Sequence, residues 1–143
     1  MKLEKNIHYH IYNRAVSKRL IFRYDRDYRL FMFKLSDFAS KYKIEIFVYC
    51  VMPNHFHILL RSDHKAENIS KFMQVLQYSY ARYFNRTRDH SGHVFESRFC
   101  PKEIKSNQEF QRVKVYILNN PVKAGLVEKR YKWPYLWLNP IHL

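Results

Sequence analysis

Apolar residues recur along the first third of the chain in two different periods. A run of β-favouring residues predicts a strand over residues 7–13, which leads into a basic loop. Apolar positions then recur every three or four residues between Tyr28 and Tyr42, and this spacing predicts a helix over residues 25–42 with Asp25 as its N-cap. The chain therefore opens with a strand followed by an amphipathic helix.

A hairpin is predicted next, within residues 44–60, where two strongly apolar stretches flank a Pro-Asn turn. Side chains on a strand alternate between the two faces of its sheet. His55 and His57 therefore point to one face of the second strand of the hairpin, while Phe56 points to the other.

A second helix is the clearest prediction in the chain. Its apolar stripe extends from Ile69 to Tyr83, and Asn68 is the expected N-cap. A polar, basic loop follows over residues 85–92, and the aromatic tail over residues 131–143 is expected to pack back on the body of the protein.

One more strand and one more helix complete the pattern. The segment over residues 95–104 is predicted to be a strand, and Pro101 places it at a sheet edge or ends it early, because proline cannot donate to a ladder. Ser106 and Glu109 form a capping box that starts a third helix. Pro121 is expected to stop this helix, since the residue before a proline avoids helical geometry.

The order of elements is strand, helix, strand, strand, helix, strand, helix. This order predicts an α+β fold, a ferredoxin-like two-layer sandwich in which an antiparallel sheet carries its helices on one face. The chain shows no repeat and no linker, so we expect one domain over residues 1–143.

Composition narrows the partners that such a domain could have. Hydrophobic residues make up 47% of the 143 residues, which excludes a disordered chain. Lys and Arg total 26 against 12 acidic residues, a formal charge of +14, and together with many Tyr and Phe this favours binding to nucleic acid. We find neither a long apolar span nor a signal-peptide pattern, and the two cysteines have no metal-type spacing. We therefore expect a cytoplasmic protein, associated with a prokaryotic nucleoid, that does not bind membranes.

The histidine pair and the third helix carry the candidate chemistry. Two imidazoles on one face of a strand form a half-site for a divalent metal, although such pairs are also found as plain polar residues beside a turn. Tyr116 and Asn120 are four residues apart and so share one face of the predicted helix. A tyrosine there is most often a packing residue.

In combination, these features describe a protein that cuts a DNA strand by transesterification. A divalent ion held by His55 and His57 would neutralise charge on a phosphodiester. Tyr116 would be the nucleophile, since a phenol, with a pKa of about 10, needs help to lose its proton. Asn120 could add an amide oxygen to the metal site.

Five segments resemble the single-tyrosine HUH transposases, and in particular the REP-associated tyrosine transposases and their insertion-sequence relatives. The resemblance spans nearly the whole chain in the order found in that family. The segments are VMPNHFHILL at 51–60, YHIYNR at 9–14, SYARYFN at 79–85, GHVFESRF at 92–99 and YILNNPVKAGLV at 116–127.

This resemblance implies a set of roles. His55 and His57 would be the metal ligands, on a central strand, and Tyr116 would form a 5′-phosphotyrosine and free a 3′-hydroxyl. Asn120 falls where the family places a third ligand, often Gln. The implied substrate is single-stranded DNA with a hairpin, and the implied metal is Mg²⁺ or Mn²⁺.

Basic residues outside this set are candidates for contacts with DNA phosphates, although charged residues also occur simply as a solvated surface. For His8 and His10, a second His-x-His pair, we expect structural or substrate contacts rather than a metal. The candidate DNA-binding residues are Arg14, Arg82, Arg86, Arg88, Arg98, Lys102 and Lys123.

Two other functions remain compatible with the sequence. A non-catalytic DNA hairpin-binding protein with a vestigial site needs only basic charge and stacking residues. An RNA endonuclease could use the histidine pair as general acid and base. A homodimer and a monomer both fit the sequence.

Overall fold

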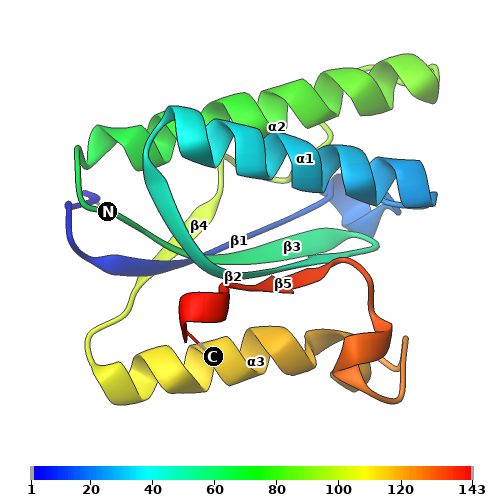
Figure 1. Ribbon diagram of the computed structural model, residues 1–143. Coiled ribbons are helices and arrows are strands. Elements are labelled where there is room, and N and C mark those ends of the chain that lie inside the picture. Colours follow the sequence, from blue (N-terminus) through cyan, green and yellow to red (C-terminus); the bar gives the residue numbers. More distant parts are fainter. Residues whose placement is uncertain (1, 143) are drawn as a thin grey trace.

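The computed structural model describes residues 2–142, and within them one five-stranded antiparallel sheet forms the centre of the fold (Figure 1). The strand order is β4-β1-β3-β2-β5, so β3, which begins with the histidine pair, is the central strand as expected. The strands are β1 (His8–Arg14), β2 (Ile44–Met52), β3 (His55–Ser62), β4 (Cys100–Glu103) and β5 (Leu136–Leu138).

Three α-helices of the described chain cover the two faces of this sheet: α1 (Asp25–Lys41), α2 (Glu67–Thr87) and α3 (Asn107–Lys123). Figure 1 shows α1 and α2 on one face and α3 on the opposite face. The α+β fold with an antiparallel sheet is confirmed, but the expectation that all helices lie on one face is wrong for α3. The reason is that β2 and β3 are apolar on both faces, and each apolar face has to be covered.

The two faces of the sheet therefore have separate hydrophobic cores. The core under α1 and α2 contains Phe56 and Ile58 of β3 together with Phe31 and Tyr80 of the helices. The core under α3 contains Leu59 of β3, together with residues of β2 and of α3 itself. Alternate residues of one strand thus enter different cores, and the histidine pair shares its face with Leu59.

Strand pairing fixes the neighbours of the histidines. In the antiparallel register of β1 and β3, Tyr12 lies opposite His57 and Arg14 lies opposite His55. On the other side of β3, Cys50 of β2 lies opposite His57. The side chains of β1 that accompany the histidines are therefore those at even positions.

Three helix boundaries differ from those predicted. The N-cap of α1 is Tyr24 and not Asp25, and the carboxylate of Asp27 accepts from the backbone N–H of Tyr24 at 3.0 Å. Helix α2 begins at Glu67, and Asn68 does not cap it; instead, the Asn68 amide donates to the carbonyl of Tyr42 at 2.9 Å. Helix α3 continues through Pro121 to Lys123, because a proline in the last turn removes only one hydrogen bond. The start of α3 is as expected, since Ser106 accepts from the backbone N–H of Glu109 at 3.0 Å.

The edge strands also differ from the prediction. The strand expected over residues 95–104 is shorter in the structure, because only its second half, β4, pairs continuously with another strand. Phe95 makes a single bridge to Ala15. Pro101 does lie on an edge strand. The tail supplies a strand that the sequence did not reveal, because β5 pairs with β2 with Trp137 opposite Tyr49.

Candidate active site

The histidine pair lies at the start of β3, on the face that α3 covers. The imidazole centroids of His55 and His57 are 5.1 Å apart, and the ring planes are nearly perpendicular. His57 is 3% exposed and His55 is partly buried. Phe56, between them, points into the other core and contacts Phe31, as strand alternation predicts.

Helix α3 brings two of its side chains to this pair. Ile117 and Leu118 are buried in the core under α3, which fixes the rotation of the helix about its axis. With that rotation, the Oδ1 atom of Asn120 lies 3.3 Å from the Nε2 atom of His55. The ring of Tyr116, one turn earlier, lies 5.6 Å from the ring of His57 and is 44% exposed. One chain therefore brings all four predicted residues together, with the phenol open to solvent.

The hydrogen bonds of His55 leave a position that suits a cation. Burial lowers the pKa of His55, so the ring is neutral and carries one N–H. The amide of Asn54 donates to the carbonyl of Lys18, and its Oδ1 faces the Nδ1 atom of His55 at 2.7 Å. If Nδ1 of His55 carries the proton and donates it to Asn54, then Nε2 of His55 and Oδ1 of Asn120 face each other as two acceptors. A metal ion between them would satisfy both lone pairs.

The other imidazoles at the site are also held neutral. Burial, reinforced by the neighbouring histidines, lowers the pKa of His57 to about 2. Burial and the charge of Lys102 lower the pKa of His10 to about 4. The neutral form is the one that binds metals. Within residues 2–142, no three His, Cys, Asp or Glu side chains could hold a metal together. The amide oxygen of Asn120, which faces His55, would be the third donor of such a site.

Two residues of β1 also lie at the site: His10, for which the sequence predicts a structural or substrate contact, and Tyr12, for which it predicts no role. The Nε2 atom of His10 lies 2.9 Å from the Nδ1 atom of His57, and the ring of Tyr12 lies 5.2 Å from that of His57. His8, the other member of the second histidine pair, packs instead against Phe47 and Phe110. Alternation along β1 could have placed His10 and Tyr12 on one face, but the register between β1 and β3 is a tertiary property.

Three of the candidate DNA-binding residues surround this site. Arg14 follows Tyr12 on β1 and forms an ion pair with Glu96 at 2.8 Å. Lys102 of β4 lies opposite His10 in the sheet. The Nζ atom of Lys123 lies 5.8 Å from the centre of the Tyr116 ring.

The other four candidates lie along α2 and the segment after it. Arg82 and Arg86 are exposed on one side of α2, and Arg98 is exposed ahead of β4. Arg88 has a different role, because it forms an ion pair with the fully buried carboxylate of Asp27. Its guanidinium is thereby held against Asp27 and the side chain is 19% exposed. A contact between Arg88 and DNA stays a prediction.

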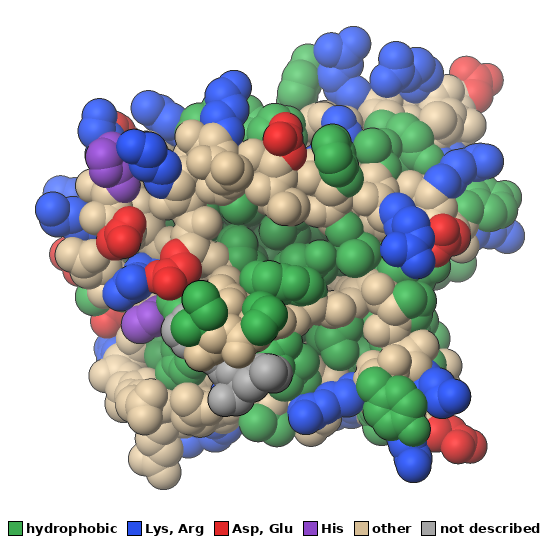
Figure 2. Space-filling view, viewed as in Figure 1, with side chains coloured by type: hydrophobic (Ala, Val, Ile, Leu, Met, Phe, Trp, Pro, Cys, Tyr) green, Lys and Arg blue, Asp and Glu red, His purple; other side chains and the backbone are tan. Residues whose placement is uncertain are grey.

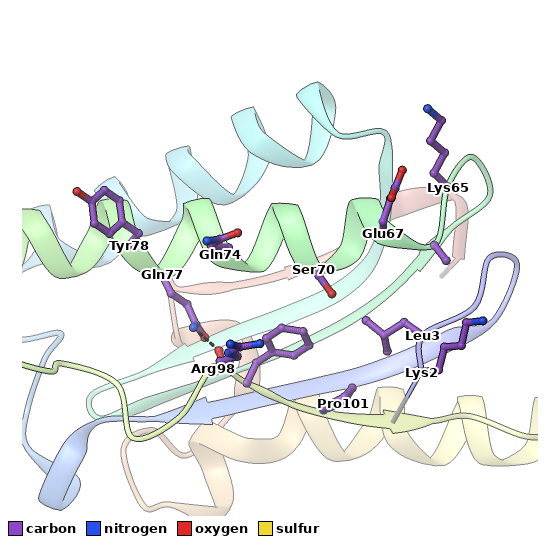
Figure 3. Close-up of a pocket in the computed structure, with 12 residues that line it drawn as sticks. Lys2, Leu3, Lys65, Glu67, Ser70, Gln74, Gln77, Tyr78, Arg98 and Pro101 are labelled. Carbon is purple, nitrogen blue, oxygen red and sulfur yellow. Dashed lines mark hydrogen bonds between the residues drawn. The ribbon is translucent and has the colours of Figure 1, made fainter.

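Arg98 lines a groove that lies between α2 and β4, on the face away from the histidines (Figure 3). The groove has a volume of about 1070 Å³. Tyr78 and Gln74 of α2 form one wall, and Pro101 of β4 lies on the opposite side (Figure 3). Lys65 and Arg98 contribute positive charge to its lining.

The molecular surface is strongly basic. Figure 2 shows Lys and Arg side chains spread around the margin of one face, whose centre is largely hydrophobic. None of the helices within residues 2–142 combines the length and the apolar character that crossing a bilayer requires. The charge distribution suits a polyanionic partner.

Sequence comparison decides the family of this chain. The family model described as "Transposase IS200 like" matches residues 4–120, a range that includes the histidine pair, Tyr116 and Asn120. The chain belongs to the IS200-like transposase family. A Haemophilus influenzae protein assigned as a REP-associated tyrosine transposase is 26% identical to this IS200-like protein over 117 residues. That match covers 71% of the chain and 66% of the relative, just under two thirds of the relative's length.

Solved structures show that the fold of this IS200-like protein is shared. A REP-associated tyrosine transposase bound to a REP hairpin matches with a TM-score of 0.76 at 17% identity, over 100% of this chain and 88% of the other. A protein from Deinococcus radiodurans R1 that is assigned as a transposase matches with a TM-score of 0.55 at 21% identity, over 83% and 97% of the two chains. These likenesses establish the arrangement of sheet and helices.

Proposed function

We propose that this IS200-like protein is a metal-dependent DNA transposase that cleaves and rejoins single-stranded DNA through Tyr116. The observation that carries this proposal is the convergence of α3 and β3. An accessible phenol lies beside the buried imidazole of His57, and the amide oxygen of Asn120 faces the Nε2 atom of His55. A packing residue would not need to be 44% exposed beside a neutral histidine pair.

In the proposed reaction, His55, His57 and Asn120 would hold Mg²⁺ or Mn²⁺, which supplies charge neutralisation at the phosphate when it is bound. The Tyr116 oxygen forms a bond to the phosphorus and loses its proton to solvent. The bond from phosphorus to the 3′-oxygen breaks, and that oxygen leaves as a hydroxyl after taking up a proton. The 5′-phosphotyrosine keeps the energy of the phosphodiester, so that a 3′-hydroxyl can reverse the step and join a new strand without ATP.

Charged residues around the phenol would guide the phosphate to it. Lys123 lies over the Tyr116 ring, where an ammonium can contact a phosphate oxygen next to the attacking atom. Lys102 lies on the opposite side of the site, across from His10. Arg14 would contribute through its exposed part, because Glu96 holds the rest of its guanidinium.

The remaining basic residues form a second DNA contact along α2. Tyr78, Arg82 and Arg86 are spaced four residues apart, so they share one face of the helix, and Tyr78 and Arg98 line the same groove. Exposed tyrosine rings can stack on unpaired bases while the guanidinium groups contact phosphates. The structural neighbour that holds a REP hairpin supports a hairpin as the DNA partner.

A covalent-adduct assay tests the proposal. The protein is incubated with Mg²⁺ or Mn²⁺ and a labelled single-stranded oligonucleotide that contains a hairpin, and protein–DNA adducts are separated on a denaturing gel. We expect an adduct from the wild type and from Tyr131→Phe, which alters an exposed tyrosine outside the site. We expect none from Tyr116→Phe, and little from His57→Ala.

Other outcomes contradict the proposal in different ways. An undiminished adduct in Tyr116→Phe would place the nucleophile elsewhere. Tight hairpin binding without an adduct under any metal would favour a non-catalytic binding protein. Metal-independent cleavage that requires a 2′-hydroxyl would favour an RNA endonuclease.

A further inference from the structure

We propose that His10 is a positioning residue, which accepts the Nδ1–H of His57 and so keeps the Nε2 atom of His57 free to bind the metal. The inference rests on the proposed function in one respect, namely that His57 is a metal ligand. It goes beyond that function because it assigns a task to a residue of β1 that belongs to neither β3 nor α3.

The contact between the two rings is direct. The Nε2 atom of His10 lies 2.9 Å from the Nδ1 atom of His57, so one of the two nitrogens donates and the other accepts. The rings are nearly parallel, with centroids 5.1 Å apart and planes 27° apart. His10 is paired in register with Leu59, two residues beyond His57, so the sheet itself holds the two rings as diagonal neighbours.

The ring of His57 is also held from its other sides. The ring of Tyr12 lies 5.2 Å away, that of His55 lies 5.1 Å away, and that of Tyr116 lies 5.6 Å away. With these rings around a side chain that is 3% exposed, His57 has little freedom to turn over and exchange the positions of its two nitrogens. The tautomer of the ring then decides which nitrogen carries a lone pair.

His55 shows which tautomer the site favours. Both nitrogens of the ring face amide oxygens, but the contact from Nδ1 to Asn54 is 2.7 Å and that from Nε2 to Asn120 is 3.3 Å, so the shorter contact assigns the proton to Nδ1 and leaves a lone pair on Nε2. The free Nε2 atom is the one that faces Asn120. If His57 presents the same nitrogen as its neighbour, then its Nδ1 atom carries the proton and His10 accepts it. The opposite direction, with His10 donating, would place the proton of His57 on Nε2 and block the ligand position.

Such a partner has a known physical effect on a metal site. A histidine ligand whose second nitrogen donates to a fixed acceptor keeps its orientation and becomes more basic, and loss of the acceptor typically lowers metal affinity about 10- to 100-fold. We expect His10→Leu, which removes the acceptor, to show this loss. His10→Gln retains an acceptor oxygen on a side chain of similar length and should restore most of the affinity. His8→Leu, on the same strand and face but packed against Phe47, is the matched control.

The experiment measures the tautomer and the metal affinity separately. Long-range ¹H–¹⁵N correlation spectra of the metal-free proteins report which nitrogen of His57 carries the proton, and calorimetric titration with Mn²⁺ reports the affinity. Circular dichroism confirms that each variant is folded. We expect Nδ1–H at His57 in the wild type, in His8→Leu and in His10→Gln. In His10→Leu we expect a shift toward Nε2–H, together with Mn²⁺ binding weakened about 10- to 100-fold.

Two results would overturn the inference. One is a wild-type His57 that carries its proton on Nε2. The other is a His10→Leu variant with unchanged His57 signals and wild-type Mn²⁺ affinity. A failure of the proposed function looks different: no protein, including the wild type, would bind Mn²⁺, while the His57 tautomer would still depend on His10. That outcome keeps the positioning role and removes the metal.

Discussion

His57 shows how strongly its surroundings change the chemistry of one side chain. In water an imidazole is partly charged near neutral pH, but burial beside two other imidazoles holds the pKa of His57 at about 2. His10 is shifted in the same direction by burial and by Lys102. The spacing of His55 and His57 predicts that they share a face, whereas their protonation depends on the residues that other elements bring to them.

These buried histidines should make the stability of the metal-free protein depend on pH. The pKa of His10 is about 4 when folded and 6.5 when exposed, so between these values the unfolded chain binds more protons. The free energy of unfolding should therefore be fully developed above pH 6.5 and fall as the pH is lowered toward 4. This difference in the pKa of His10 corresponds to a loss of about 3 kcal/mol in the free energy of unfolding. Urea unfolding at a series of pH values should show that His10→Gln loses less of its free energy of unfolding at low pH than the wild type does.

An exposed histidine provides the control for this experiment. His64→Gln changes a solvent-exposed side chain outside the site and should follow the wild type at every pH. If His10→Gln lost as much stability as the wild type between pH 6.5 and pH 4, burial of His10 would not contribute to the pH dependence.

At the scale of elements, helix α3 decides whether the candidate site exists. The four-residue spacing of Tyr116 and Asn120 places them on one side of the helix, and that follows from helical geometry alone. Their meeting with the histidines requires that α3 cover the face opposite to α1 and α2. Pro121 does not prevent this, because the helix continues for two residues beyond it and keeps Asn120 in helical geometry.

The cap of α3 should contribute measurably to stability. The hydroxyl of Ser106 accepts from the backbone N–H of Glu109, and a lost N-cap typically costs about 1 kcal/mol. We expect Ser106→Ala to lower the free energy of unfolding by that amount in urea titrations. The same exchange at the exposed Ser36 inside α1 should change it by less than about 0.5 kcal/mol. Equal effects at both positions would mean that the cap contributes nothing specific.

At the scale of the whole molecule, the sheet separates two basic regions. Lys102, Lys123 and Arg14 lie around the histidine face, whereas Arg82 and Arg98 lie along α2 and its groove. Their arrangement suggests that one DNA molecule contacts both regions by passing over an edge of the sheet. The short edge strand β4 carries Lys102 and adjoins the groove, so it lies on such a path.

This arrangement predicts how DNA affinity depends on salt. Each phosphate contact on a single strand contributes about −0.7 to the slope of log K against log salt concentration. The double variant Arg82→Gln/Arg98→Gln should therefore bind a single-stranded hairpin oligonucleotide with a slope reduced by about 1.4. Fluorescence anisotropy titrations at several salt concentrations measure the slope.

A charge-matched variant separates specific contacts from the overall charge. Arg26→Gln/Lys41→Gln removes the same charge from exposed positions on α1 and should leave the slope nearly unchanged. If both double variants reduced the slope equally, only the net charge of +14 would matter, and the groove would have no special role.

Much of this protein could be predicted from local patterns. The three helices and the central hairpin follow from apolar periodicity, and the shared face of His55 and His57 follows from the pleat of a strand. Edge placement of Pro101 and the cap at Ser106 follow from the hydrogen-bonding properties of single residues. The short strand β5 was missed because three residues are too few to show a period.

The sequence by itself determined which residues are candidates for the chemistry, because residue type and spacing are local properties of the chain. Only the tertiary structure decided which face of the sheet α3 covers, which strand lies beside β3, and which contacts each basic side chain makes. His10 reaches His57 through strand register, and Arg88 is held by Asp27, although neither relation leaves a periodic signal in the chain. Register and layer order depend on packing between distant segments, and so they are fixed only when both apolar faces of the sheet are covered.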